Sequence, residues 1–513
     1  WRNTPEIELM KIATALAEVA FNPRHQSVLH SERLIQTVQD PGGVIETMPS
    51  RISGFDCVLG NPPWERIKLQ EEEFFAQRDP EIALLPGDRR KKAITSLVKT
   101  NPALAFDFET AKHSAESSSR FVRYSESYKL TAVGDVNTYA LFAELNRKLL
   151  DPHGRAGIII PSGIATDDST KQFFQSVVES HALYKLFEFE NEGFFQGAGQ
   201  GHMLRFCLLT LVGQKDQIEI AEFMFQGKRI TDLLNPERRF NLTSSEFALF
   251  NPNTLTCPIF FTKRDAELTR KVYRQVPVLE NEKNGKNPWG ISFLRMFDMS
   301  NDSDLFVTEP CDGFVPLFES KMFYQYTHRH GDYGLVSGGE RKHVLPDVPE
   351  SLLNDPNYFV SPHYWIPRED VDNRLRGKWS CDWLICFRNV TDSRASIRTL
   401  VFSLLPRVGV GNSAPLLLTS IDQASLVACL LANFSSLVLD YITRQKVSGL
   451  NLNFFIVKQL PVLPPEAYVP ADIEFISSRV LELVYTAYDL RPFAKDMGYH
   501  CEAFRWDEER RTF

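Results

Sequence analysis

The pattern of apolar and polar positions changes along the chain and predicts both helices and strands. Apolar residues recur at a helical period through the first forty residues. A short apolar run from Phe55 to Leu59 then stops at Gly60, Asn61 and two prolines, which predicts a buried strand that ends in a loop. Residues 65–130 are charged and weakly periodic, so we expect helices and loops inserted after that strand.

Helical and strand-like segments alternate after the inserted region. The pattern predicts helices at 137–150 and 170–180, a turn at 152–154, and strands at 155–161, 184–189 and 204–212. This order predicts an α/β domain with a mostly parallel sheet, which ends near residue 225.

From about residue 230 the pattern becomes irregular, and helical periodicity returns only in places. The clearest helical segments are 263–274, 424–444 and 470–488. We therefore divide the chain into five parts: a helical lead-in (1–50), an α/β domain (51–228, with 65–130 inserted), a connecting segment (229–284), a mixed α+β domain (285–468) and a C-terminal helical segment (469–513).

Composition narrows the class of protein. The hydrophobic fraction of 43% and the charged fraction of 24% are ordinary for a folded soluble chain. No run approaches the roughly 18–20 apolar residues that span a bilayer, so we expect a cytoplasmic protein without a membrane partner. The eight cysteines form no CxxC pair and no Cys/His ligand spacing, so we expect reduced thiols and no metal site.

The net charge of −8 does not by itself favour nucleic acid as a partner. The distribution of charge is more informative than its sum. Residues 361–460 contain eleven Lys and Arg against seven Asp and Glu. A basic stretch on an acidic protein suits a module that faces DNA.

The segment from Asn61 to Trp64 carries the candidate chemistry. The strand before it would deliver Asn61 to the carboxyl edge of a parallel sheet, where such sheets bind ligands. The Asn61 side-chain oxygen and the Pro62 carbonyl can each accept one N–H of an exocyclic amine, which frees the lone pair of that amine for attack. Trp64 can stack on a flipped base. Asn-Pro-Pro is also a common turn, but the preceding strand and the following aromatic favour chemistry.

These residues resemble the catalytic motif of the gamma-type amino-methyltransferases in the type IIG restriction–modification methylase family. Within that family the chain is most similar to the large methylases of BREX and DISARM phage-defence systems. Three further stretches are similar to motifs that follow in the family: 135–142, 152–162 and 187–195. The resemblance implies an adenine-N6 DNA methyltransferase that uses S-adenosylmethionine and modifies host DNA in restriction–modification or phage defence.

The resemblance also implies a fold and partners. The fold is a partial, Rossmann-like class I methyltransferase sheet, followed by a mixed α+β target-recognition domain at 285–468. The implied partners are double-stranded DNA and other defence-system subunits.

Roles for individual residues around the motif follow from the same resemblance. Phe194 is the implied second aromatic against the flipped base, and Phe195 is the neighbour with which it could be confused. Pro63 is an implied contact to the cofactor, and Asp56, Tyr139 and Phe142 are further candidates. Asp56 could equally orient the catalytic loop or cap a strand. For Tyr139 and Phe142, which we place on the buried face of a helix, core packing is the favoured role and cofactor contact the alternative.

One family feature is missing from the sequence. Residues 1–60 contain neither the glycine-rich cofactor loop nor a clear acidic residue for the cofactor ribose. The glycine-rich segment 196–201 lies downstream and precedes a strand, so we interpret it as an active-site hairpin. We expect the cofactor half on sequence before residue 1. The alternatives are a non-catalytic DNA-recognition subunit or fragment, and a methyltransferase for RNA or protein glutamine.

Five basic residues are candidate DNA contacts: Lys321, Arg329, Arg407, Arg444 and Lys446. The first two lie in a segment that mixes basic and aromatic residues, and Arg407 precedes a glycine-rich loop. Each could instead be a solvated charge, and the last two could neutralise a helix C-terminus. The sequence contains no evident nuclease motif.

Overall fold

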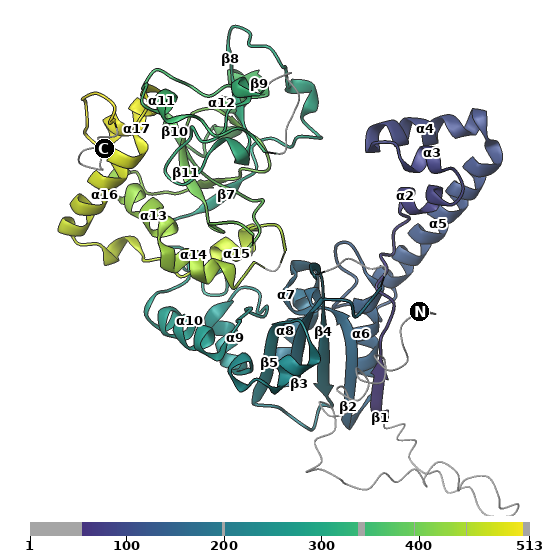
Figure 1. Cartoon of the computed structure of the whole chain (residues 1–513). Coiled ribbons are helices and arrows are strands. Elements are labelled where there is room, and N and C mark those ends of the chain that lie inside the picture. Colours follow the sequence, from purple (N-terminus) through teal and green to yellow (C-terminus); the bar gives the residue numbers. More distant parts are fainter. Residues whose placement is uncertain (1–53, 197–200, 337–343, 394, 448, 506–513) are drawn as a thin grey trace, which may run out of the picture. The chain divides into compact units, whose positions relative to one another are not determined.

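The computed structural model describes residues 54–196, 201–336, 344–393, 395–447 and 449–505 (Figure 1). The predicted lead-in helix in 1–50 and the four central residues of the glycine-rich hairpin lie outside the described residues. The chain forms two compact units, residues 1–248 with 254–266 and residues 249–253 with 267–513. Helices α9 (Ser244–Phe250) and α10 (Lys263–Gln275) each contain a point where the chain passes between the units.

The first unit is built on a six-stranded sheet with the order β1-β2-β4-β3-β5-β6. Its strands are β1 (Phe55–Gly60), β2 (Leu150–Pro161), β3 (Leu183–Asn191), β4 (Gly201–Val212), β5 (Ile220–Gly227) and β6 (Phe240–Thr243). Only β1–β2 and β3–β5 pair in parallel. The prediction of a mostly parallel sheet is therefore wrong, because β4 turns back from β3 and inserts antiparallel between β2 and β3. The sheet also extends past the predicted boundary at 228, since β6 pairs with β5.

Strand β1 forms where the apolar run predicted a strand, but it is not buried. Within the described residues β1 pairs only with β2, so it lies at one edge of the sheet. The side chains of Phe55 and Leu59 are 58% and 49% exposed. A short apolar run does not distinguish a central strand from an edge strand, so the sequence pattern predicted a buried strand here.

The predicted turn at 152–154 is also wrong, because β2 runs through it. The three residues of β1 from Phe55 to Cys57 face the six residues from Leu150 to Arg155 on β2, so the pairing contains a bulge there. Gly154 is required at this bulge, since a Cβ would lie 2.5 Å from the carbonyl oxygen of Phe55. A proline and a glycine close together, as in Pro152-His153-Gly154, are typical of a turn, but here they lie in an irregular strand.

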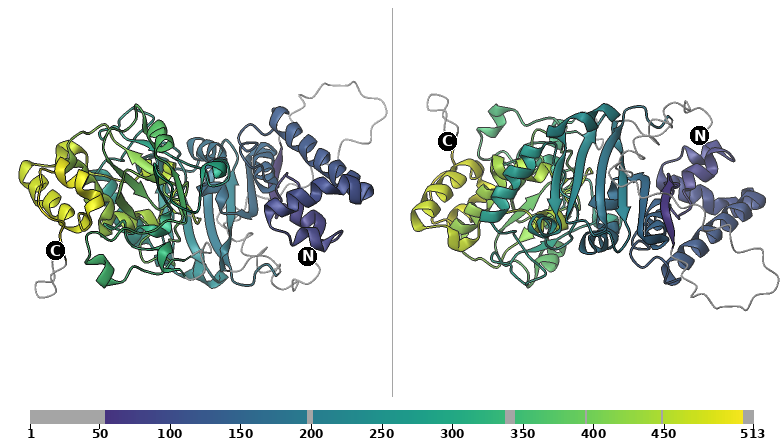
Figure 2. Two further views of the ribbon diagram at one scale, coloured as in Figure 1. Left: turned by 90° about the horizontal axis from the view of Figure 1, so that it is seen from above. Right: turned by 90° about the horizontal axis from the view of Figure 1, so that it is seen from below.

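Helices α6 (Thr138–Lys148), α7 (Gly163–Thr166) and α8 (Lys171–Glu179) belong to the sheet domain, and the two longer ones were predicted. The inserted region forms an arm of four helices beyond the β1 edge (Figures 1 and 2): α2 (Glu71–Ala76), α3 (Pro80–Ala83), α4 (Gly87–Thr100) and α5 (Pro102–Tyr124). The arm has a core of its own, formed by Phe74, Phe75, Ile82, Ala83, Leu97, Leu104 and Phe108.

The second unit combines two small sheets with helices around one large hydrophobic core. Its strands are β7 (Ser292–Leu294), β8 (Phe314–Phe318), β9 (Tyr364–Pro367), β10 (Trp383–Phe387), β11 (Phe402–Pro406), β12 (Gly409–Val410) and β13 (Leu416–Leu418). Its helices are α11 (Glu350–Leu353), α12 (Arg368–Leu375), α13 (Ala424–Ser435), α14 (Leu437–Arg444), α15 (Phe454–Lys458), α16 (Pro470–Val484) and α17 (Arg491–Asp496). The C-terminal helices share this core, so they are part of the same unit.

The predicted single helix at 424–444 is two helices, α13 and α14. Ser436 has an extended backbone and its hydroxyl accepts a hydrogen bond from the Leu439 N–H, which caps a new helix after a bend of 53°. Among the described residues no single helix has the length and hydropathy to cross a bilayer, and only this bent pair reaches them when both helices are taken together.

Candidate active site

Asn61 follows β1 at the edge of the sheet where the parallel strands β1 and β2 both end. Its side-chain oxygen Oδ1 is buried and has no hydrogen-bond partner among the described residues. The Pro62 carbonyl likewise receives no hydrogen bond in the described part of the chain. A buried acceptor without a partner is costly and rare, so Asn61 Oδ1, with the unbonded Pro62 carbonyl next to it in the chain, indicates that an external donor belongs here.

Thr138, at the first position of α6, holds the loop that follows Asn61. Its hydroxyl donates to the Pro63 carbonyl at 2.7 Å and accepts from the Glu65 N–H at 3.0 Å. The Thr138 N–H in turn donates to the Glu65 carbonyl at 2.9 Å. These bonds hold the loop from Pro63 to Glu65 and do not involve Asn61 Oδ1 or the Pro62 carbonyl. Thr138 was not predicted as a site residue, although it lies inside the 135–142 segment.

Trp64 packs down onto the sheet beside Asn61. The indole N–H donates to the Ile159 carbonyl of β2 at 3.3 Å. The edge of Phe195 meets the indole with ring centroids 5.0 Å apart at 69°, and Phe206 lies nearly parallel to the indole at 6.3 Å. The ring is only partly buried, so it can offer surface to a flat ligand.

Phe194 and Phe195 have different neighbours in this aromatic cluster. Phe194 contacts Phe189 and Phe206, with centroids 5.7 and 5.3 Å apart. In the described structure Phe195, not Phe194, forms the ring contact with Trp64. Phe195 is therefore the neighbour of Trp64 in this structure, whereas the role of Phe194 against a flipped base stays a prediction.

Asn191, at the end of β3, fixes the backbone of Phe195. The fully buried Asn191 carboxamide accepts the Phe195 N–H at 2.8 Å and donates to the Phe195 carbonyl at 2.9 Å. Two bonds to one residue close a short loop that aims the Phe195 ring at Trp64. Asn191 was not predicted as a site residue either, since an asparagine after a strand is usually a turn residue.

The four predicted cofactor contacts differ in their exposure. Asp56 is exposed on β1, five residues and therefore roughly 16 Å before Asn61, so it cannot orient the catalytic loop. Tyr139 is buried, and burial, with Asp167 and Cys207 nearby, raises the pKa of its hydroxyl. Phe142 is 41% exposed, so the prediction of a buried position is wrong for it.

Pro63 lies two residues after Asn61, and its ring is exposed. The part that each of the four residues plays in binding a cofactor stays a prediction.

Two of the five predicted DNA contacts are structural instead. Arg329 is 1% exposed, and its guanidinium donates to the carbonyls of Leu353, Asp355, Tyr358 and Thr486. The Lys446 ammonium donates to the Phe250 carbonyl at 2.6 Å and lies over the Tyr273 ring, and burial holds the pKa of Lys446 well below its usual value. Neither side chain is available to a phosphate, because Arg329 and Lys446 donate to acceptors inside the second unit.

The other three are tied to neighbours but partly exposed. Arg407 pairs with Asp372 at 2.8 Å, and Lys321 approaches Glu319 at 3.5 Å. Arg444 pairs with Asp440 at 3.1 Å and donates to the carbonyls of Ser393 and Ser396. Their side chains are 17–29% exposed, so contact with DNA remains a prediction for these three.

Residues 110–195 match the Eco57I restriction-modification methylase family. The match begins within α5 and runs through α6, β2 and β3 to Phe195. It supports the resemblance to restriction–modification methylases over this segment, and it does not include Asn61–Trp64. No curated protein matches the chain.

The chain is also similar to parts of several solved structures. The type IIG restriction endonuclease BpuSI is 12% identical over 72% of this chain and 49% of that chain, with a TM-score of 0.26. The type IIL restriction-modification enzyme MmeI, in complex with DNA, is 9% identical over 86% and 57%, with a TM-score of 0.36. A type I restriction-modification methyltransferase subunit from Streptococcus thermophilus is 13% identical over 41% and 39%, with a TM-score of 0.23. This chain therefore spans about half the length of BpuSI and MmeI.

Proposed function

We propose that the protein is an adenine-N6 DNA methyltransferase of a restriction–modification or phage-defence system. The observation that carries the proposal is the pair of unpartnered acceptors, Asn61 Oδ1 and the Pro62 carbonyl, beside the Trp64 ring. An exocyclic amine on a flat base has the two N–H donors and the ring face that such a site lacks. The methylase match over 110–195 supports the same reaction class.

The residues of the chain act on the base. Asn61 and Pro62 each accept one N–H of the adenine amine, which localises the nitrogen lone pair and orients it for attack. Trp64 stacks on one face of the adenine and compensates for part of the stacking lost when the base leaves the duplex. S-adenosylmethionine is the methyl donor that the family resemblance implies.

The Phe195 edge meets Trp64 in the described state. A base sandwiched between two rings needs about 7 Å between them, and the centroids of Trp64 and Phe195 are 5.0 Å apart. Entry of the base therefore requires a shift of Phe195, and Asn191 is the residue that sets its starting position.

The direct test is to sequence the host genome for N6-methyladenine with and without the gene. We expect one short sequence motif to lose its adenine methylation when the gene is deleted. An unchanged methylome would contradict the proposal. Titration of the chain with the non-reactive analogue sinefungin separates a complete enzyme from a chain that only recognises DNA.

Substituting Phe195 should weaken base stacking more than substituting Phe194. We expect Phe195→Leu to reduce the fluorescence change of 2-aminopurine placed at the target adenine, with a loss of about 1–2 kcal/mol in binding of the flipped state. Phe194→Leu is the matched control, because it removes an equal ring that contacts Phe189 and Phe206 instead. Equal effects of the two variants, or a larger effect of Phe194→Leu, would return the role to Phe194.

Removal of the Thr138 hydroxyl should loosen the catalytic loop. Thr138→Val keeps the shape of the side chain but leaves the Pro63 carbonyl and the Glu65 N–H without their partner. We expect about a tenfold lower methylation rate, equivalent to the loss of ~1–1.5 kcal/mol. Thr138→Ser, which keeps the hydroxyl, should retain most of the rate, and a Ser variant as slow as the Val variant would argue against this role.

A further inference from the structure

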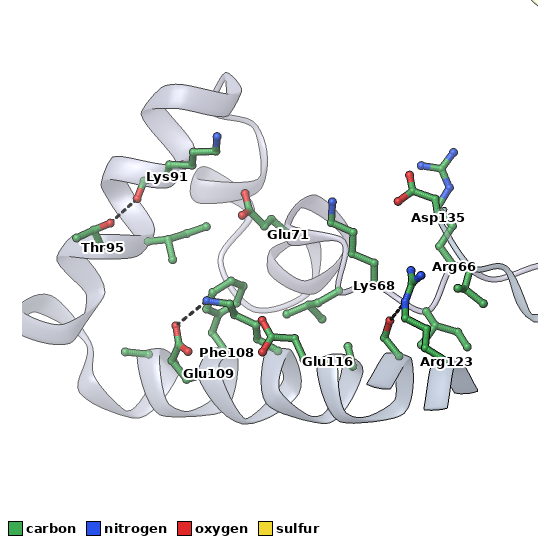
Figure 3. Close-up of a pocket in the computed structure, with 18 of the residues that line it drawn as sticks. Arg66, Lys68, Glu71, Lys91, Thr95, Phe108, Glu109, Glu116, Arg123 and Asp135 are labelled. Atoms are coloured by element: carbon green, nitrogen blue, oxygen red, sulfur yellow. Dashed lines mark hydrogen bonds and ion pairs between the residues drawn. The ribbon is translucent and has the colours of Figure 1, made fainter. Parts of the chain in front are cut away.

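The helical arm contains a cleft of about 660 Å³. Its walls come from residues 66–71, from α4, from α5 and from Asp135 and Val136 (Figure 3). The cleft lies within the first unit and is separate from the aromatic cluster around Trp64. Its lining contains five basic and four acidic residues, which stand around an apolar floor that includes Leu69, Ile94 and Phe108.

The cleft is attached to the catalytic loop. Arg66, its first lining residue, is two positions after Trp64, so their Cα atoms are at most about 7 Å apart. Arg66 pairs with Asn137 in an antiparallel bridge, and the Ile67 N–H donates to the Val136 carbonyl at 2.9 Å. This two-stranded neck fixes the start of the cleft beside the candidate base site.

Three cations of the cleft have no partner within the described residues. Neither an ion pair nor a side-chain hydrogen bond is formed by Arg66, Lys68 or Lys91 there, and all three are exposed. By contrast, Lys112 lies 3.8 Å from Glu109, and Arg123 donates to two backbone carbonyls. The arm therefore keeps three positive charges available to a ligand.

The acidic residues of the cleft are not placed evenly around the three cations. Figure 3 shows Glu109 and Glu116 on α5, whereas Lys68 and Lys91 extend from the walls opposite, with Glu71 between them. Lys91 belongs to a run of four consecutive cations, residues 89–92, in the first half of α4. Of this run, Arg90 bonds within the arm to Glu72 and to the carbonyls of Ala83 and Leu85, whereas Lys91 is exposed and lines the cleft.

We propose that this cleft binds the phosphodiester backbone of the target DNA next to the flipped base. Arg66, Lys68 and Lys91 would each neutralise a phosphate, which positions the strand without reading its sequence. DNA is the occupant that the free cations and the attachment to the base site favour. The inference rests on the proposed function, since it takes DNA as the substrate.

The salt dependence of DNA binding tests this role. The cleft variant carries Arg66→Gln, Lys68→Gln and Lys91→Gln. The control carries Arg120→Gln, Lys99→Gln and Lys129→Gln, which remove three positive charges from exposed positions outside the cleft, on α5, on α4 and just after α5, where Lys129 pairs with Glu126. Each lost phosphate contact lowers the slope of log K against log salt by about 0.9 on duplex DNA. We therefore expect the slope to fall by about 2–3 in the cleft variant and by less than about 0.5 in the control.

The outcomes separate the cleft from the proposed function. If the unmodified chain binds duplex DNA and both variants show the same slope, the cleft proposal is overturned and the proposed function is untouched. If the unmodified chain does not bind DNA, both fail. A fall in slope with single-stranded RNA but not with duplex DNA would overturn the assignment of DNA. Thermal unfolding of both variants, expected to match the unmodified chain, confirms that only the surface charge has changed.

Discussion

Replacing Asn61 with alanine is expected to reduce adenine methylation by about 10²–10³-fold while duplex DNA binding changes by less than about twofold. The variant removes Oδ1, the buried acceptor that has no partner among the described residues. Because that oxygen makes no described contact within the protein, its loss should cost little stability. Methylation in the host, read by sequencing the genome, and thermal unfolding of the purified chain measure the two effects separately.

Asn61→Asp is the informative companion to this variant. It keeps an acceptor oxygen at the same position but adds a negative charge and removes the amide N–H donors. We expect it to retain more activity than Asn61→Ala if acceptance from the adenine amine is the function of Oδ1. Full activity in Asn61→Ala would show that the chemistry lies elsewhere, and the methyltransferase proposal would then lose its main support.

Apolar periodicity in the sequence predicted the positions of individual helices and strands well, because it depends only on neighbouring residues. α6, α8, α10, β3 and β4 lie where apolar periodicity placed them, and the inserted region is helical as expected. What the sequence could not predict depends on pairing over long distances. The edge position of β1 and the antiparallel insertion of β4 follow from which strands meet, and an apolar run gives no information on that.

The candidate site shows the same division between local and distant information. Asn61, Pro62 and Trp64 could be named from a short motif, and the structure adds that Asn61 Oδ1 is buried without a partner among the described residues. Thr138 and Asn191 act through hydrogen bonds to residues whose geometry no spacing in the sequence specifies.

The predicted DNA contacts failed at Arg329 and Lys446 for a different physical reason. A basic residue in a sequence is presumed to be solvated, because burying a charge is costly. Both residues are exceptions, since backbone carbonyls surround the Arg329 guanidinium and two protein oxygens receive the Lys446 ammonium.

Replacing Arg329 with alanine is expected to destabilise the second unit by about 3–5 kcal/mol. The guanidinium joins three separate segments, because its acceptors lie at 353–358 and at Thr486 while Arg329 itself precedes β9. Without it, four carbonyls lose a charged donor and a cavity remains where the buried side chain was. Burial lowers the pKa of Arg329, with Asp489 and Asp355 opposing the shift, yet an arginine keeps its charge at neutral pH.

Thermal or urea unfolding of the chain measures this effect, and Arg407→Ala is the matched control. Arg407 forms one partly exposed ion pair with Asp372 and one bond to a carbonyl, so its loss should cost about 1 kcal/mol or less. Arg329→Lys, which keeps a donor in the same place, should recover part of the stability and bind duplex DNA with an unchanged salt slope. The contrary result would be an Arg329→Ala variant as stable as Arg407→Ala, with a slope of log K for DNA binding against log salt that falls by about 0.9. Arg329 would then be a phosphate contact, and its side chain would have to leave its buried site to reach the DNA.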